Sequence, residues 1–337
     1  GIFKEFKFAN KDEIRELSVA AWLHDCGKVT TPEYVVDKAT KLETIYNRIH
    51  EIRTRFEVIY RDLIIESYEK ILNKEEEQTV KKWLQKQQQR LKEEFEFIAN
   101  ANKGAEFMTQ EDKQRIQEIA QRQWTAYFDD SLGLSYDEQL RYVKKESNIE
   151  YLLDNKPNHL IPRSPKSVSD YDKYGFKVEV LQYLYNLGEV YNLCVERGTL
   201  TAEERFKINE HMSMTIKMLE QLPFPSNLKR VPEYAAAHHE TLIGTGYPRK
   251  LTKEQMSIPA RIMAIADVFE ALTAADRPYK EGKKLSESIK ILSYMVKDQH
   301  LDEDIFKLFL RSGVYLKYAK AYLKEEQIDE VDISIFV

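Results

Sequence analysis

The sequence predicts an almost entirely α-helical protein. Only 11 of the 337 residues are glycine and 10 are proline, so the chain contains few of the residues that interrupt helices. Charged residues make up 32% of the chain, which is typical of long helices with solvated faces. Apolar residues recur at spacings of three and four along much of the chain, and no segment carries a clear strand or hairpin signal.

The first hundred residues predict one helix followed by a long helical hairpin. Residues 11–25 carry an apolar face, and Gly27 follows as a stop signal. Residues 43–100 carry two apolar stripes, and Leu72-Asn73-Lys74 between them predicts a turn in which Asn73 caps the second helix. The stripes are formed by Phe56, Ile59, Leu63 and Ile71, and by Val80, Leu84, Leu91, Phe95 and Ile98.

Further helices are predicted after residue 100. The capping box from Thr109 to Asp112 predicts a helix that ends near Phe128. Residues 154–172 contain three prolines and predict an extended loop. A second capping box, Thr201 to Glu204, opens a helix that reaches Leu222. The other predicted helical ranges are 176–195, 231–240, 259–274, 285–297 and 302–325.

Charge and cysteine content predict a cytoplasmic protein that binds no polymeric nucleic acid. The net charge is −5, whereas proteins that hold nucleic acid through their surface field are normally basic. Cys26 and Cys194 lie far apart in the sequence and suit a reducing compartment. We expect no membrane insertion, because no run of 18 apolar residues and no signal peptide occurs. The helix-like pattern at residues 2–6 predicts a sensor or membrane segment upstream in the full protein.

Six side chains of the types that bind transition metals stand out from the rest of the sequence. They are His24, Asp25, His211, His238, His239 and Asp267. Adjacent helical residues point about 100° apart, so a His-Asp or His-His pair is better suited to serve two neighbouring ions than to chelate one. Asp267 lies in an apolar helix, where an unpaired carboxylate is costly. Mixed imidazole and carboxylate ligands favour Fe, Mn or Zn over Mg or Ca.

These residue types predict phosphoryl-transfer chemistry. Two ions about 3.5–4 Å apart activate a hydroxide and hold both oxygens of an in-line displacement at phosphorus. His50, His159 and His300 have no other candidate ligand next to them in the sequence. We expect them to be ordinary core or surface residues.

The same residues lie in two blocks that resemble the HD-GYP family, a branch of the HD phosphohydrolases. The first block, within residues 11–42, contains Leu23-His24-Asp25-Cys26-Gly27-Lys28 and Thr31-Pro32-Glu33. The second block, within residues 196–297, contains the 198–204 capping segment, His211, His238-His239-Glu240, Gly244-Thr245-Gly246-Tyr247-Pro248-Arg249, Ala266-Asp267 and Asp276-Arg277-Pro278-Tyr279-Lys280. The resemblance implies an HD-domain helical bundle formed by residues 1–42 and 196–337, with 43–195 as a helical insertion.

The resemblance also implies roles for individual residues. The metal ligands would be His24, Asp25, His211, His238, His239 and Asp267, with Asp25 bridging two ions. Asp25 and Lys28 would be catalytic, and Lys28 would contact the scissile phosphate. The remaining substrate contacts would come from Gly246, Tyr247, Pro248, Arg249, Arg277 and Lys280.

The activity implied by the resemblance is metal-dependent hydrolysis of a bacterial cyclic dinucleotide. HD-GYP proteins bind two or three Fe or Mn ions and cleave cyclic di-GMP to a linear dinucleotide or to GMP, and related members prefer cyclic GMP-AMP. The expected reaction is hydroxide attack on phosphorus. The alternative is a catalytically degenerate HD-GYP module that binds a cyclic dinucleotide or partner proteins as a signalling sensor.

The sequence departs from the family pattern in several places. A further histidine ligand of the family would precede Gly1, and Leu242-Ile243 stand where Trp-Asp is common. Cys26 replaces an aliphatic residue, which we interpret as a small buried filler, with metal-linked thiol oxidation as the alternative. His50 also suits the third-ligand position, but we prefer His211 because the sequence around it matches the family.

The largest departure is the insertion of residues 43–195 between the two blocks. Its apolar stripes suit packing against another helix, so one hypothesis is that it forms a homodimer or relays a signal from an upstream sensor. The alternative is a domain extension without such a role.

Overall fold

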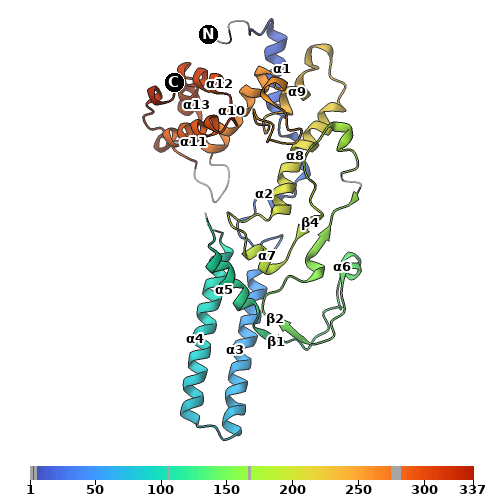
Figure 1. Ribbon diagram of the computed structural model, residues 1–337, viewed down its shortest axis with the longest axis vertical. Helices are drawn as coiled ribbons and strands as arrows, with labels where there is room; N and C mark the ends of the chain where they lie inside the picture. The colour runs from blue at the N-terminus through green and yellow to red at the C-terminus, as the bar shows by residue number, and fades with distance from the viewer. Residues whose placement is uncertain (1–2, 4–5, 105–106, 166–167, 275–281) are drawn as a thin grey trace. The chain divides into compact units, whose positions relative to one another are not determined.

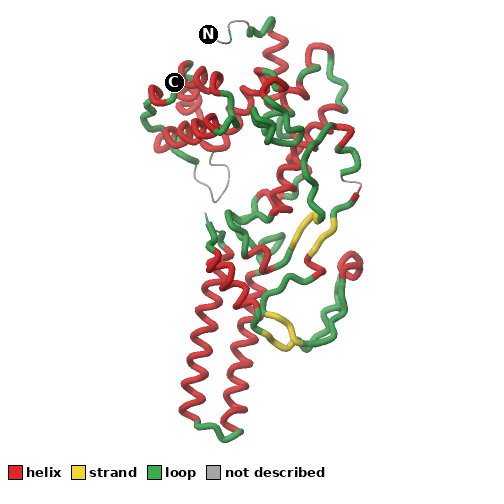
Figure 2. The backbone as a smooth tube through the Cα atoms, in the orientation of Figure 1, coloured by secondary structure: helices red, strands yellow, loops and turns green. Residues whose placement is uncertain are grey.

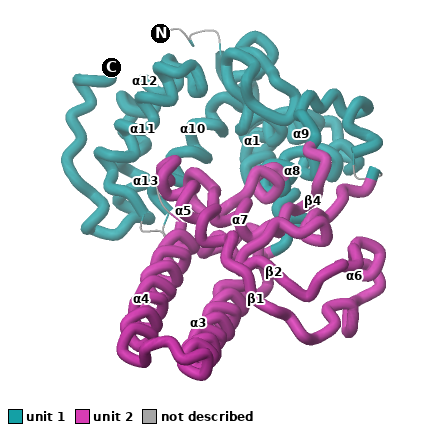
Figure 3. Tube along the Cα trace, turned by 60° about the horizontal axis from the view of Figure 1, so that its bottom comes forward, with its two compact units in different colours: residues 1–32, 165–180, 207–337 teal, residues 33–164, 181–206 magenta. Residues whose placement is uncertain are grey.

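The computed structural model describes residue 3 and residues 6–104, 107–165, 168–274 and 282–337 (Figure 1). Helices dominate the described secondary structure (Figure 2), which confirms the all-α prediction. Contacts divide the chain into two compact units (Figure 3): unit 1 comprises residues 1–32, 165–180 and 207–337, and unit 2 comprises residues 33–164 and 181–206. The domain ranges predicted from the sequence, 1–42, 43–195 and 196–337, stay a prediction. No helix in the described ranges combines the length and apolar character needed to cross a bilayer.

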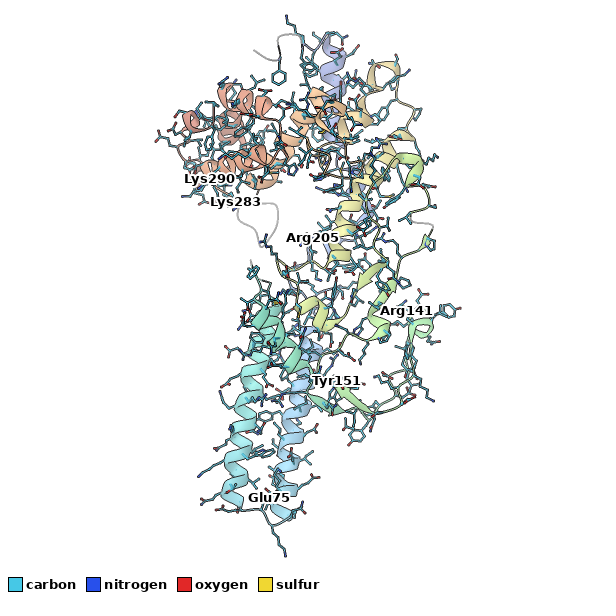
Figure 4. All side chains as sticks on the ribbon, viewed as in Figure 1. Glu75, Arg141, Tyr151, Arg205, Lys283 and Lys290 are labelled. Carbon is cyan, nitrogen blue, oxygen red and sulfur yellow. The ribbon has the colours of Figure 1, made fainter. Side chains whose placement is uncertain are left out.

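Unit 2 is built around the predicted helical hairpin. Its helices are α2 (Glu33–Val36), α3 (Ile49–Leu72), α4 (Glu77–Asn102), α5 (Gln110–Ala120), α6 (Tyr136–Arg141) and α7 (Glu189–Leu193). The long helices α3 and α4 lie side by side, and Figure 4 places Glu75 at the turn between them. Both predicted stripes contribute to the buried core, where the rings of Phe56 and Phe95 pack edge to face at 5.2 Å. Asn73 caps the end of α3, whereas the N-cap of α4 is Glu76, so the predicted role of Asn73 was wrong.

Unit 2 also contains two short hairpins that the sequence analysis did not predict. Strand β1 (Gln123–Thr125) pairs antiparallel with β2 (Ile149–Tyr151), and β3 (Leu160–Pro162) pairs antiparallel with β4 (Tyr183–Asn186). The capping box of Thr109 and Asp112 is present, but α5 ends at Ala120 rather than near Phe128, because the chain continues into β1.

The helix predicted over 176–195 was wrong. Only α7 is helical there, and β4 occupies part of the range. The segment is rich in β-branched and aromatic residues, which suit a strand, and Phe176 to Val180 alternate between less and more exposed positions.

Unit 1 consists of helices that pack around several apolar cores. They are α1 (Lys11–Leu23), most of α8 (Ala202–Glu220), α9 (Val231–Ala235), α10 (Ile258–Thr273), α11 (Leu285–Lys297), α12 (Glu303–Arg311) and α13 (Val314–Tyr322). Helix α1 packs against α9, where Ala20 and Tyr234 are buried in one core. A second core lies among α10, α11, α12 and α13. The helix predicted over 302–325 is interrupted at Gly313, whose φ of +68° favours glycine.

Candidate metal centre

Four separate segments of unit 1 supply the six predicted metal ligands. His24 is the C-cap of α1, and Asp25 is the N-cap of the short 3₁₀ helix Cys26–Thr30. His211 lies within α8, and Asp267 lies within α10. His238 and His239 lie just beyond α9, in the turn that follows it.

Three of the imidazoles are oriented by backbone carbonyls three residues earlier. The Nδ1 atom of His24 lies 2.7 Å from the Ala21 carbonyl oxygen, and that of His211 lies 2.6 Å from the Ile208 oxygen. The Nδ1 atom of His238 lies 2.9 Å from the carbonyl oxygen of Ala235. Because a carbonyl only accepts, Nδ1 donates in each case and Nε2 keeps a lone pair when the ring is neutral. This arrangement is typical of histidines that bind metals through Nε2.

Asp25 lies between these imidazoles. Its Oδ1 atom is 3.3 Å from Nε2 of His211 and 3.9 Å from Nε2 of His238. Its Oδ2 atom is 3.2 Å from Nε2 of His24 and 2.6 Å from Nζ of Lys28. His24 Nε2 also lies 3.5 Å from Oδ1 of Asp267. The two oxygens of Asp25 therefore face different histidines, as a carboxylate between two ions would.

The cluster has the donors that a divalent metal ion requires. His211, His238 and His239 form one group and His24, His238 and Asp267 form another, with the ligand atoms of each group within 4.8 Å of one another. Three of the buried atoms, Asp25 Oδ1, His211 Nε2 and His238 Nε2, have no hydrogen-bond partner in the described parts of the chain. Buried acceptors without a donor are costly, and a cation between them would remove that cost. The residues thus fit a divalent metal site.

The pKa values of the histidines separate into two classes. Burial lowers the pKa of His238 to about 4, and burial together with His238 lowers the pKa of His239 to about 3. Both rings are therefore neutral near pH 7, which is the form that binds metals. Burial alone would lower the pKa of His24, but contacts with Asp25 and Asp267 raise it to about 10.

The two carboxyl groups of the cluster remain ionised at neutral pH. Burial alone would raise the pKa of Asp25, but its contacts with His211, His24 and Lys28 hold it well below its usual range. The pKa of Asp267 is also lowered, because His24 and the neighbouring imidazoles outweigh the effect of burial. Two ionised carboxylates and the neutral imidazoles of His238 and His239 make the cluster attractive to cations.

The Gly246-Tyr247-Pro248 loop packs against the paired histidines. The Tyr247 ring stacks on the His239 ring with a centroid separation of 4.9 Å and an interplanar angle of 14°. A Cβ atom at Gly246 would lie 2.5 Å from Cα of Glu240, so only glycine allows this approach. Glu240 is fully buried and accepts hydrogen bonds from the backbone N–H groups of Arg249 and Leu251. The supporting contacts of Tyr247 and Glu240 were not predicted from the sequence, since neither motif nor spacing indicates them.

Lys28 and Arg249, two of the predicted substrate-binding cations, differ from each other in their contacts and exposure. The side chain of Lys28 is 56% exposed beside Asp25. The guanidinium of Arg249 donates to the Tyr174 carbonyl at 2.9 Å and to Glu220 at 2.6 Å. Arg277 and Lys280 lie outside the described residues, so their roles stay predictions.

A cleft of about 610 Å³ opens beside the cluster. Its described lining consists of Ala21, His24, Asp25, Lys28, Met263, Ala266, Asp267, Glu270, Ala271 and Tyr318. Glu270 and Tyr318 were not predicted to be site residues. The position of Glu270, one helical turn after Asp267, could have identified it as a neighbour, but nothing in the sequence places Tyr318 there.

The remaining histidines belong to neither of the described groups of ligand atoms. In unit 2, His50 contacts Arg53, and His159 accepts a hydrogen bond from the backbone N–H of Lys156. The structure therefore groups His211, and not His50, with the other described candidate ligands.

Residues 149–305 match the family model of the HD domain. This part of the chain is similar to the HD domain. The match includes His211, His238, His239 and Asp267, whereas His24 and Asp25 precede it in the sequence.

Several cyclic dinucleotide phosphodiesterases are similar in sequence to part of this chain. A 3'3'-cGAMP-specific phosphodiesterase of Vibrio cholerae is 35% identical over 148 residues, which cover 41% of this chain and 33% of the relative. A cyclic di-GMP phosphodiesterase of Pseudomonas aeruginosa is 36% identical over 119 residues, 35% of this chain and 28% of the relative. A cyclic di-GMP phosphodiesterase of Thermotoga maritima is 33% identical over 110 residues, 32% of this chain and 29% of the relative. The chain thus matches about a third of the length of these relatives, and the matches confirm the HD-GYP resemblance.

Proposed function

We propose that this chain hydrolyses a phosphodiester bond of a cyclic dinucleotide, with cyclic di-GMP as the first candidate substrate. The proposal depends above all on one observation: imidazoles and carboxylates from four chain segments converge, and three of their buried polar atoms have no hydrogen-bond partner in the described chain. The names of the relatives, which are cyclic GMP-AMP and cyclic di-GMP phosphodiesterases, support the class of substrate.

The proposed cofactors are two or three divalent ions, either iron or manganese. The two ligand groups that share His238, with Asp25 beside both, would hold them. When bound, such ions activate water for attack on phosphorus and neutralise charge on the phosphoryl oxygens. The imidazole content of the site favours these metals over magnesium.

The protein's own residues would bind and orient the phosphodiester. Asp25 holds Lys28 at 2.6 Å, so the ammonium group lies at the cleft and can offset negative charge on the scissile phosphate. Tyr247 would keep the His239 ring in place through stacking. Further phosphate contacts from Arg277 and Lys280 belong to the same proposal.

A panel of metals tests the proposed activity. Under anaerobic conditions we expect the protein to convert cyclic di-GMP to the linear dinucleotide or GMP with Fe(II) or Mn(II), and more slowly with Mg(II). Product chromatography would measure the rates. Binding of cyclic di-GMP without cleavage under any of these conditions would contradict the proposal and favour the sensor alternative.

We also propose that the protein acts in the cytoplasm. Cys26 and Cys194 are both free in the structure, which suits a reducing compartment.

The α3–α4 hairpin is our proposed homodimerisation element. Ile65, Tyr68 and Leu72 on α3 are 56%, 65% and 80% exposed, and their spacings of three and four place them on one face of the helix. Such an exposed apolar seam on a long helix suits packing against a second helix with the same repeat.

Two charges in this seam should disrupt the dimer. We expect the parent protein to have the mass of a dimer in solution and the double variant Ile65→Glu/Leu72→Glu to have the mass of a monomer, as measured by light scattering after gel filtration. The matched control Gln85→Glu/Gln89→Glu adds the same charge to exposed polar positions of α4 and should stay dimeric. A monomeric parent protein would end the proposal.

A further inference from the structure

Residues 168–180 belong to unit 1 (Figure 3), although the predicted insertion includes them. They form an apolar core with α8 and the end of α9. The buried side chains of this core are those of Tyr171, Tyr174, Phe176, Ile216 and Ala236. Ile216 follows His211 on α8, and Ala236 precedes His238 by two positions. The 168–180 segment thus packs against two of the chain segments that carry candidate metal ligands.

Arg249 joins this segment to the loop beside the paired histidines. Its Nε atom donates to the Tyr174 carbonyl at 2.9 Å, and one of its Nη atoms donates to Glu220, the last residue of α8, at 2.6 Å. Next to Arg249, the Pro248 carbonyl accepts a hydrogen bond of 2.7 Å from the Lys177 N–H. A guanidinium presents its donors in a rigid fork, so acceptors in two different elements fix its position and that of the loop that carries it.

His239 differs from the other three candidate ligand histidines in how its ring is held. The Nδ1 atoms of those three lie within hydrogen-bond distance of backbone carbonyls, whereas no carbonyl in the described ranges orients the His239 ring in this way. The His239 ring instead stacks on Tyr247 at 4.9 Å, and the His239 carbonyl accepts a hydrogen bond of 3.2 Å from the Tyr247 N–H. A shift of the loop would therefore move the contact that orients this imidazole.

We propose that Arg249 is a positioning residue, which holds the loop against the 168–180 segment and thereby keeps Tyr247 stacked on the His239 imidazole. The inference rests on the proposed function, which makes His239 a metal ligand. It differs from the substrate contact that the resemblance implies for Arg249, because two nitrogens of the guanidinium already donate to protein groups. Residues that orient a metal ligand from outside typically change metal affinity by about 10–100-fold when they are replaced.

Binding of Mn(II) without substrate tests this role. By titration calorimetry on the metal-free protein, we expect Arg249→Met to weaken at least one Mn(II) site by about tenfold or more. Glu220→Gln keeps an oxygen that accepts from Arg249 and should bind Mn(II) as the parent does. The matched control Arg311→Met changes an exposed arginine of α12 and should also bind as the parent. If Arg249→Met fails to fold, Arg249→Lys, which keeps the charge but lacks the fork, replaces it with a loss of Mn(II) affinity as the expected result.

A double variant shows whether Arg249 acts through Tyr247. Tyr247→Leu removes the stacking on His239 and should weaken Mn(II) binding. The double variant Tyr247→Leu/Arg249→Met should bind no more weakly than Tyr247→Leu alone, because residues that act through one contact are not additive. Loaded with Co(II), the two single variants should show the same change in visible absorption, which reports the ligand geometry of the ion. Additive losses of affinity would overturn the proposal.

The outcomes separate this inference from the proposed function. Parent-like Mn(II) affinity in Arg249→Met, together with a raised KM for cyclic di-GMP, would overturn the positioning role and favour the substrate contact. Mn(II) binding by the parent without turnover of a cyclic dinucleotide would contradict the proposed function and leave the Mn(II) comparison to decide the role of Arg249. A parent protein that binds no Mn(II) would overturn both.

Discussion

Replacing His238 with alanine is expected to abolish hydrolysis of cyclic di-GMP and to remove at least one metal ion per chain. His238 belongs to both groups of candidate ligand atoms and is only 2% exposed, so no water-exposed side chain can easily take its place. We expect kcat to fall at least about a thousandfold, which corresponds to about 4 kcal/mol of lost transition-state stabilisation. Metal content by mass spectrometry and product chromatography would measure the two effects.

The fold should survive this change, because alanine removes a buried acceptor that lacks a partner in the described chain. The thermal midpoint of the metal-free protein should therefore move by less than about 5 °C. His50→Ala is a matched control, since His50 is exposed on unit 2 and lies outside the candidate ligand groups. Unchanged metal content and turnover in His238→Ala would exclude His238 as a ligand.

Gly27→Ala is expected to destabilise the protein and the metal centre together. A Cβ atom at this position would lie 2.0 Å from the His211 carbonyl oxygen and 2.6 Å from the Thr215 nitrogen, both of which belong to the backbone of α8. The helix that carries His211 would have to move. We expect a loss of about 3 kcal/mol in the free energy of unfolding, measured by chemical denaturation, and a lower metal content.

The neighbouring variant Cys26→Ala provides the control for this prediction. It shortens a partly buried side chain in the same 3₁₀ helix without adding atoms near α8, so the free energy of unfolding should change by about 1 kcal/mol or less. A Gly27→Ala protein as stable as the parent would show that α8 can shift freely.

The candidate metal ligands could be predicted from their residue types in the sequence, whereas the close approach of the Gly27 backbone to α8 could not. The six candidate ligands stand out because buried carboxylates and paired imidazoles are costly without a cation, and the structure brings all six into one part of unit 1. Gly27 was interpreted as a helix stop, yet the structure gives it a different role, the contact with α8. That contact joins segments far apart in the chain, so no local pattern could indicate it.

Secondary structure was predictable where the apolar spacing was regular and long. The α3–α4 hairpin and the capping boxes before α5 and α8 follow from local sequence alone. The short strands β1 to β4 contain only three or four residues each, which is too few to establish a period. Their pairing depends on partners more than 20 residues away, for example Leu160 with Asn186.

The hydrogen bond from the Gly27 N–H to the Thr215 hydroxyl joins residues separated by 188 positions. For a flexible chain, closing so long a loop carries an entropic cost that grows with loop length. Most of the intervening residues form unit 2, which has its own apolar core and is synthesised before His238 and Asp267. Early folding of unit 2 would shorten the flexible chain between Asp25 and His211. Residues of unit 2 that are not ligands would then influence how fast the metal centre assembles during synthesis.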